Sequence, residues 1–512
     1  MKNSYRILLN TIILYINMLI TMLITLFSTR WVLQALGEED YGIYNLVAGV
    51  IVLFSFFNVA MSAATQRFMS YSQGEGKEDT IKRTFYYSVL MHIFIALVVV
   101  LLWEIGGRYF LENVLDIPNN RKPESLVILH CLSASTFFSI LSVPYQATVN
   151  AHENMLLLAL INIVETVLKL LSALCLLLFN GDRLILYGFL LMLISLNSYV
   201  IIRWYSRKHY KETIYTWEKV KDFVYFKTMF FFAGWNFIGS ITSLLRNQGQ
   251  ALLLNVFFGV IINAAYGICN QVSGMLGFFA DSVIRAIRPQ IVKSEGGGDR
   301  CRMLSLSLST CKFSFLLLLF VGIPLYVEMP YVLTLWLAEV PKFTVDFCRL
   351  VIIMALVRQL SIGISISLDS IGRIKWVQIL VGGLHIFVLP ISYILLKLGY
   401  TPTVVLICAI IEESIAVIVR IVLCHNIAGL DVKIFLKEVL IPCICLCIFC
   451  LFVINQISII LVSSFISLVL LSISNFIIVC LLAYGLILNH SEKSIINSIL
   501  TTVKLQKMKH FL

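Results

Sequence analysis

Long runs of apolar residues, separated by short polar stretches, dominate the chain. Each run has about 20 residues, the length that an α-helix needs to cross a bilayer, and none alternates like a membrane β-strand. The pattern therefore predicts an all-α integral membrane protein with fourteen transmembrane helices. The predicted ranges are 8–28, 42–63, 85–103, 126–148, 155–179, 184–205, 228–250, 256–280, 304–327, 348–369, 376–397, 403–425, 438–456 and 460–488.

Composition agrees with this pattern and excludes a water-soluble protein. Hydrophobic residues make up 59% of the chain and charged residues 13%, whereas a soluble domain carries about 25% charged residues. The first apolar run, from Ile7 past Phe27, is too long for a signal-peptide core and no small-residue cleavage site follows it. We expect it to be a retained transmembrane helix.

The positions of Lys and Arg predict the orientation. With the N-terminus in the cytoplasm, 28 of the 39 Lys and Arg residues fall on the cytoplasmic side, 8 fall outside and 3 lie within the membrane. Cytoplasmic loops carry this excess of basic residues. An even number of helices returns the C-terminus to the cytoplasm, and the tail from Asn489 onward is basic. We therefore expect a multi-pass protein with both termini in the cytoplasm.

A repeated phrase predicts an internal duplication. The stretch YGIYNLVAG at 41–49 recurs as YGICNQVSG at 266–274, with six identities in nine positions. Each copy begins the second helix of a six-helix set, so we expect Gly42 and Gly267 to allow tight helix entry and packing. Two lobes of equal orientation, related by an axis along the membrane normal, are a known transporter architecture. The predicted parts are an N-terminal lobe (1–206), a linker (207–227), a C-terminal lobe (228–430) and helices thirteen and fourteen with a basic tail (431–512).

The linker carries apolar residues at helical spacing, with lysines between them. Tyr210, Ile214, Trp217 and Val224 form the apolar set. This pattern is typical of an amphipathic helix on the cytoplasmic membrane surface. An irregular basic loop is the alternative.

Basic residues inside the predicted spans are candidates for cargo binding, because each costs about 2.5–3.5 kcal/mol to insert. Arg246 lies in the outer half of helix seven and Arg358 near the middle of helix ten; Lys169 is in the middle of helix five. Guanidinium groups at such depth need a wet cavity or a partner, and they bind phosphate through paired hydrogen bonds. We expect Arg246 and Arg358 to line a cationic cavity. Arg30, near the outer end of helix one, either joins them or extends to the interface.

Three acidic residues within the predicted spans are candidates for ion coupling. Glu165 and Lys169 are four residues apart, which fits a structural ion pair as well as a function. Glu412 and Glu413 lie in helix twelve with no basic residue beside them in the sequence. Carboxyl groups in apolar surroundings suit proton binding.

Other signals are weak, and we expect no metal, no cofactor and no enzymatic activity. The cysteines of CICLCIFC (443–450) point to different faces of a helix, and SEGGGD lacks the Lys of a phosphate-binding loop. His92, His130 and His385 are isolated in apolar segments, where a satisfied core histidine is the usual case.

Several local phrases together resemble a transporter family. They are LGEEDYGIYNLV (36–47), YQATVNAHEN (145–154), LTLWLAEVPKF (333–343) and IGRIKWVQI (371–379). With fourteen predicted helices in two lobes plus two, the chain resembles the multidrug/oligosaccharidyl-lipid/polysaccharide exporter superfamily. Within that superfamily it resembles the Wzx-type polysaccharide repeat-unit flippases.

The resemblance implies a flippase for undecaprenyl-diphosphate-linked oligosaccharides in the bacterial inner membrane, working by alternating access in O-antigen or capsule synthesis. It makes Arg30, Arg246, Arg358 and Lys169 the candidates for diphosphate contact. Expected partners are the lipid-linked oligosaccharide, membrane lipids, a polysaccharide polymerase and a chain-length regulator, and not nucleic acid. A lipid II flippase, a drug or cation exporter and a membrane polysaccharide polymerase are the alternatives. The absence of acidic residues from the cores of helices one and two argues against a cation exporter.

Overall fold

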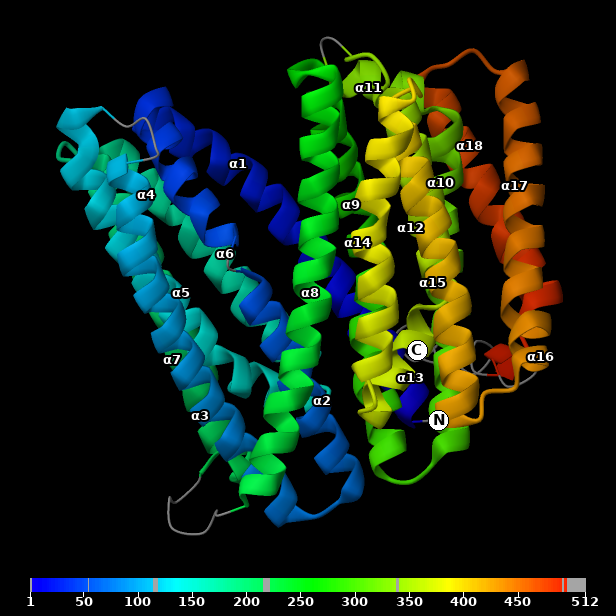
Figure 1. Ribbon diagram of the computed structural model, residues 1–512, viewed down its shortest axis with the longest axis horizontal. Coiled ribbons are helices and arrows are strands. Elements are labelled where there is room, and N and C mark those ends of the chain that lie inside the picture. The colour runs from blue at the N-terminus through cyan, green and yellow to red at the C-terminus, as the bar shows by residue number, and fades with distance from the viewer. Residues whose placement is uncertain are drawn as a thin grey trace, which may run out of the picture. The chain divides into compact units, whose positions relative to one another are not determined.

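The computed structural model describes residues 2–53, 55–113, 118–214, 222–337, 340–489 and 492–494, and it is helical without a strand in these ranges (Figure 1). The helices of the first half, with short 3-10 or π turns written η, are α1 (Lys2–Leu53), α2 (Ser55–Glu75), α3 (Glu78–Leu102), η1 (Trp103–Gly107), α4 (Arg108–Asn113), η2 (Asn119–Arg121), α5 (Lys122–Ala151), α6 (Met155–Leu178), α7 (Arg183–His209) and η3 (Lys211–Thr213).

The second half is helical in the same way. Its elements are α8 (Phe223–Phe258), α9 (Val260–Gly296), α10 (Arg300–Val327), α11 (Met329–Trp336), α12 (Thr344–Gln359), α13 (Ile362–Ile371), α14 (Lys375–Lys397), α15 (Val404–Ala428), α16 (Val432–Phe435), η5 (Leu436–Leu440), α17 (Ile441–Ile460), α18 (Phe465–Leu482) and η6 (Ala483–Ile487).

These helices make the chain a multi-pass membrane protein. Among the described residues, ten helices are long and apolar enough to cross a membrane, or eleven if α12 and α13, which meet at a bend of 45°, form one broken span. Each predicted range falls mostly on helix, with breaks at 259, 360–361 and 461–464 inside three of the ranges, and the total of fourteen spans stays a prediction. α15 is long and apolar but carries three Glu and Arg residues, Glu412, Glu413 and Arg420, and all three belong to the site in the C-terminal unit.

The chain folds as two compact units. The N-terminal unit is Asn10–Ser240 and the C-terminal unit is Met1–Leu9 with Ile241–Leu512, so the division falls inside α8. The predicted lobes and their boundaries, and the duplication itself, stay predictions. In the N-terminal unit, α5 packs along α7 and α3, with Ile128 and Trp103 fully buried in the core.

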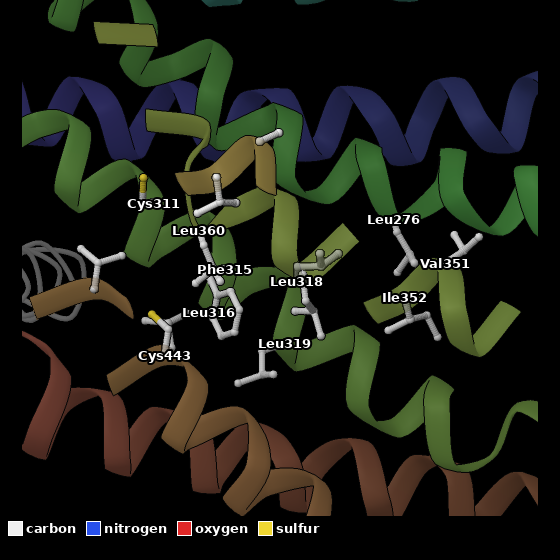
Figure 2. Packing of buried hydrophobic residues seen from close by; sticks show 14 of the residues in the cluster. Leu276, Cys311, Phe315, Leu316, Leu318, Leu319, Val351, Ile352, Leu360 and Cys443 are labelled. Carbon is white, nitrogen blue, oxygen red and sulfur yellow. The ribbon is translucent and has the colours of Figure 1, made fainter. Parts of the chain in front are cut away.

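α10 is the central helix of the C-terminal unit, where it packs against α9, α12, α13, α17 and α18. Phe315, Leu318 and Leu319 of α10 are accordingly buried, together with Ile352 of α12 and Cys443 of α17 (Figure 2). This core holds α12, α13 and α15 in fixed positions around the polar residues described next.

Two glycines with matching backbone conformation break the chain near the repeated phrases. Gly37 interrupts α1 at φ 79° and ψ 173°, and Gly259 separates α8 from α9 at φ 79° and ψ −171°. Only glycine adopts this region readily. The expectation for Gly42 and Gly267 is wrong: a Cβ atom at either would meet nothing within 4 Å. Helix entry depends instead on the glycines a few residues earlier.

The predicted surface helix of the linker falls partly outside the described residues, and its described ends do not form one helix, because Tyr210 is extended and Val224 belongs to α8. Tyr210 follows α7, η3 comes next, and Trp217 lies within 215–221, which the structure does not describe. The basic tail from residue 495 also lies outside the described ranges.

Candidate functional site

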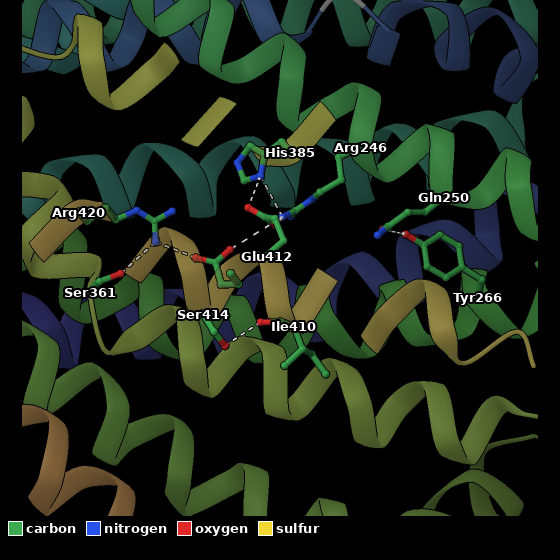
Figure 3. Close-up of polar contacts among 10 residues, drawn as sticks. Arg246, Gln250, Tyr266, Ser361, His385, Ile410, Glu412, Ser414 and Arg420 are labelled. Carbon is green, nitrogen blue, oxygen red and sulfur yellow. Dashed lines mark hydrogen bonds and ion pairs between the residues drawn. The ribbon is translucent and has the colours of Figure 1, made fainter. Parts of the chain in front are cut away.

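Side chains from three helices of the C-terminal unit meet in a buried charge cluster (Figure 3). Nη1 of Arg246 in α8 lies 2.7 Å from Oε2 of Glu412 in α15 and 3.2 Å from Nδ1 of His385 in α14. The same His385 nitrogen lies 2.9 Å from Oε1 of Glu412. The side chain of Arg246 is 11% exposed and that of Glu412 is 4% exposed. We call Arg246, His385, Glu412, Glu413 and Arg420 the central cluster.

Adjacent positions on α15 send the two carboxylates to different partners. Successive residues of a helix point about 100° apart, so Glu412 and Glu413 cannot share one neighbour equally. Glu413 Oε1 accepts a hydrogen bond from Nη1 of Arg420 at 2.7 Å, two turns further along the same helix. Its other oxygen, Oε2, lies 3.9 Å from Nη1 of Arg246. Two Arg residues and two Glu residues thus balance in charge.

Close packing of α8 against α14 brings Arg246 to His385. A Cβ atom on Gly382 would lie 3.1 Å from Oγ1 of Thr242, and one on Gly249 would lie 2.6 Å from a Leu389 methyl group. These two glycines lie about one turn from His385 and from Arg246, respectively. Each removes a side chain where the helices approach each other, so the polar pair between them is within hydrogen-bonding distance.

The bend between α12 and α13 supplies a further partner. Ser361 lies in this break, is fully buried, and its Oγ accepts a hydrogen bond from Nη1 of Arg420 at 2.9 Å. Arg358, in the last turn of α12, is exposed. Its charge acts on the Glu413 carboxylate, but no ion pair joins it to another described residue.

A second polar site lies in the N-terminal unit. It is a pocket of about 290 Å³ formed by α1 on both sides of the Gly37 break, by α6 and by α7. Tyr44 and Tyr187 meet there with ring centroids 5.0 Å apart. We call it the hydroxyl pocket, because seven of its nine lining residues carry a hydroxyl group. The lining residues are Thr25, Ser28, Thr29, Val32, Tyr41, Tyr44, Thr166, Lys169 and Tyr187.

The four basic residues chosen from the sequence have different surroundings. Lys169 lines the hydroxyl pocket and pairs with Glu165, with Nζ 2.9 Å from Oε1. Arg246 is neutralised in the central cluster. Arg30 and Arg358 are exposed, and neither takes part in the Lys169–Glu165 pair or in the central cluster. A single cationic cavity is therefore not what the described residues of either unit form.

Glu412 and Glu413 differ from the expectation in their surroundings. The sequence shows no basic neighbour, yet Arg246 and Arg420 contact them. The spacing of Glu413 and Arg420, seven residues on one helix face, was the available signal. Arg246 and His385 come from distant helices and left no signal in one sequence.

The isolated histidines also fall into two groups. His92 is a fully buried core residue, with Nδ1 2.7 Å from the Ser88 carbonyl oxygen and Nε2 without a hydrogen-bond partner among the described residues. His130 and His385 each contact a carboxylate, at 2.7 Å from Glu104 and 2.9 Å from Glu412. His385 is the functional candidate that sequence reasoning missed.

Comparisons with known proteins agree with the fold. Residues 14–174 match the MatE family model. The uncharacterized membrane protein EpsK of Bacillus subtilis (strain 168) is 23% identical over 332 residues, which is 64% of this chain and 64% of that protein. The chain thus spans less than two thirds of the length of this curated relative.

Solved transporter structures are similar over most of the chain. An outward-facing multidrug resistance MATE family transporter of the MOP superfamily has a TM-score of 0.72 at 12% identity, covering 83% of this chain and 96% of that one. The bent conformation of MATE has a TM-score of 0.73 with the same identity and coverage. A MOP superfamily transporter from Pyrococcus furiosus, for which reversed polarity of the binding pocket suggests a different function, has a TM-score of 0.70 at 11% identity, covering 83% of this chain and 96% of that one. The chain has a MATE-like transporter fold.

Proposed function

We propose that this protein translocates undecaprenyl-diphosphate-linked oligosaccharides across the bacterial inner membrane by alternating access, for surface polysaccharide biosynthesis. The observation that carries the proposal is the chemistry of the hydroxyl pocket. Hydroxyl groups and tyrosine rings are suited to sugars, and the Lys169 ammonium is suited to phosphate. None of the lining residues that the structure describes is acidic.

The Lys169 ammonium group can bind an anion, because its ion pair with Glu165 is weak. Its side chain is 45% exposed, and its pair with Glu165 is a partly exposed (i, i+4) contact, which is worth about 0.3–0.5 kcal/mol. A hydrogen bond to a charged group contributes about 1.5–3 kcal/mol. A diphosphate can therefore displace Glu165 from Lys169 at low cost.

Export of drugs or organic cations is the second candidate, and the likeness to multidrug MATE structures favours it. Its weakness is chemical, because the described lining of the hydroxyl pocket has a lysine and no carboxylate to balance the charge of a cationic cargo. The Pyrococcus furiosus transporter, with its reversed pocket polarity, suggests that pocket chemistry distinguishes functions within this fold. A lipid II flippase would share the diphosphate contact and differ in the sugars recognised.

The proposal also includes the location of the protein and its partner proteins. We expect the protein in the inner membrane with both termini in the cytoplasm, near a polysaccharide polymerase and a chain-length regulator. No covalent step is required, since the cargo leaves unchanged.

Flipping of a fluorescent lipid-linked oligosaccharide in proteoliposomes tests the proposal. Lys169→Gln should slow the initial rate about ten- to hundredfold, the equivalent of a lost charged hydrogen bond. Lys82→Gln is the matched control, because Lys82 pairs with Glu78 at 3.4 Å on an exposed surface. Wild-type protein that exports a cationic dye but leaves the oligosaccharide in place would overturn the proposal in favour of the second candidate.

A further inference from the structure

One nitrogen of His385 lies within hydrogen-bonding distance of two groups, and these require opposite protonation states of that nitrogen. Nδ1 lies 3.2 Å from the Arg246 Nη1, which can only donate, and 2.9 Å from the Glu412 Oε1. An unprotonated Nδ1 accepts from Arg246 but then opposes the lone pairs of Glu412. A protonated Nδ1 donates to Glu412 but then faces the Arg246 N–H. Each protonation state satisfies one contact at the expense of the other.

The hydrogen-bond donors of Arg246 are also incompletely paired. Its Nη1 makes the contacts to Glu412, Glu413 and His385, while its Nε is buried with no hydrogen-bond partner among the described residues. A buried donor left unpaired is uncommon and costly. The guanidinium group is thus held by one nitrogen only, and a small change in the charge of its partners is enough to move it.

We propose that His385 and Glu412 bind one proton that drives transport, and that Arg246 is the counter-charge which this proton displaces. The inference rests on the proposed function, because a driving proton requires a cargo. It extends that function by naming the coupled ion and the residues that bind it. In the sequence only the carboxylates were candidates for this role.

One proton added to the His385–Glu412 pair changes the charge balance of the central cluster. With His385 neutral, Arg246 and Arg420 balance Glu412 and Glu413. Arg358 of α12 adds one exposed positive charge that acts on Glu413. A proton on the His385–Glu412 pair leaves the cluster with excess positive charge in a buried site, which weakens the hold of Glu412 on Arg246.

The displaced contact joins helices. Arg246 belongs to α8, His385 to α14 and Glu412 to α15, so the ion pair ties α8 to the other two. Loosening it on protonation changes the relative energies of two helix arrangements, which is the requirement for a ligand to shift a conformational equilibrium. Proton binding is thereby linked to movement of α8 against its neighbours.

Gradient-driven flipping in proteoliposomes tests the inference. If one proton moves per cargo, a one-unit pH gradient should sustain about a tenfold transbilayer ratio of cargo in the wild type, since one pH unit is a factor of ten in proton concentration. His385→Gln and Glu412→Gln should reduce this ratio to about one while exchange of cargo at equal pH continues. His130→Gln is the matched control, because His130 also contacts a carboxylate, at 2.7 Å, but is half exposed. Full gradient-driven accumulation in both test variants would overturn the inference.

A second measurement needs no cargo and separates this inference from the proposed function. Histidine-selective ¹⁵N NMR in nanodiscs follows each imidazole between about pH 5 and 8, the range of ordinary histidine titration. The His385 signal, identified by its loss in His385→Gln, should change over this range and change differently in Glu412→Gln. An invariant signal overturns the proton site even if flipping is observed. A titrating signal without flipping overturns the proposed function alone.

Discussion

The C-terminal unit contains a second buried charge cluster, and it differs from the central cluster in how completely its atoms are satisfied. Lys312 of α10 is fully buried, with Nζ 2.7 Å from Oε2 of Glu492 and 3.7 Å from Oε2 of Glu438. The other Glu492 oxygen accepts from Ser309 Oγ at 2.6 Å. Each Glu492 oxygen therefore has its own donor, whereas in the central cluster one His385 nitrogen serves two groups.

A contact further along α10 joins this helix to α18. Pro324 in α10 has no N–H, so the carbonyl group of Phe320, four residues earlier, lacks its helical partner. Nδ2 of Asn475 in α18 donates to Phe320 O at 3.0 Å and to Leu319 O at 3.1 Å. Together with Lys312–Glu492, this contact joins α18 and the following residues 492–494 to α10. A buried charge whose hydrogen-bonding groups all have partners stabilises the fold, whereas a buried group whose one nitrogen contacts two groups can change its protonation state.

The largest expected effect is at the complete cluster. Lys312→Met removes the counter-charge of a buried carboxylate, so we expect the free energy of unfolding to fall by about 3–5 kcal/mol. Thermal melting in detergent measures it. The double variant with Glu492→Gln should recover most of the loss. Lys82→Met, at an exposed pair, should cost at most about 1 kcal/mol. Equal melting of Lys312→Met and wild type would contradict the structural role.

A smaller loss of stability, with a larger loss of transport, is expected at the central cluster. Arg246→Ala leaves Glu412 with His385 as its remaining partner, so we expect a loss of about 2–3 kcal/mol and little flipping. Arg358→Ala should change stability by less than about 1 kcal/mol, because Arg358 is exposed. Melting and flipping assays on both variants decide this. A larger loss of stability for Arg358→Ala than for Arg246→Ala would reverse the assignment.

Much of the fold was predictable because it depends on length and apolarity alone. The predicted ranges lie mostly on helix, since a bilayer forces backbone groups to pair within the segment. The charge pairings were not predictable in the same way. The 28 Lys and Arg residues predicted to face the cytoplasm include Lys312 and Arg420, yet Lys312 is fully buried and Arg420 contacts Glu413. A loop-charge count cannot distinguish a residue facing water from one a turn or two deeper that faces a carboxylate.

The candidate site shows the same limit more sharply. Arg246 and Glu412 were each identified from the cost of a charge in the membrane, but for separate roles. They are 166 residues apart in sequence and 2.7 Å apart in space. Their contact depends on how α8, α14 and α15 pack, which depends on positions such as Gly382 and Gly249 that carry no chemical signal of their own.

An intermediate effect should follow from crowding the contact of α13 with α10. A Cβ atom on Gly363 would lie 2.0 Å from the backbone oxygen of Ser307, so Gly363→Ala should cost about 1–3 kcal/mol and displace Ser361 from Arg420. Gly383→Ala is the matched control, since a Cβ atom there meets nothing within 4 Å. Melting temperatures should separate the two variants. Similar melting of both would mean that α13 adjusts freely and does not position the central cluster.

The smallest effect concerns a histidine–carboxylate pair at the edge of the N-terminal unit, outside the spans. His152 Nε2 lies 2.6 Å from Glu212 Oε1. Burial alone would raise the pKa of Glu212, but the His152 hydrogen bond, the Glu212 backbone N–H and the charges of His152 and Lys82 together hold it below its usual 4.5.

A carboxyl group with a lowered pKa in the folded state stabilises the fold at a pH above its unfolded pKa, and this contribution is lost as the pH falls through the folded pKa. Glu212→Gln should therefore be less stable than wild type at neutral pH, by under about 1 kcal/mol at this partly exposed pair. The melting curves of the variant and the wild type should approach each other as the pH falls below 4.5. A difference that persists unchanged into acid would show that the Glu212 charge contributes nothing, in contrast to the His385–Glu412 pair.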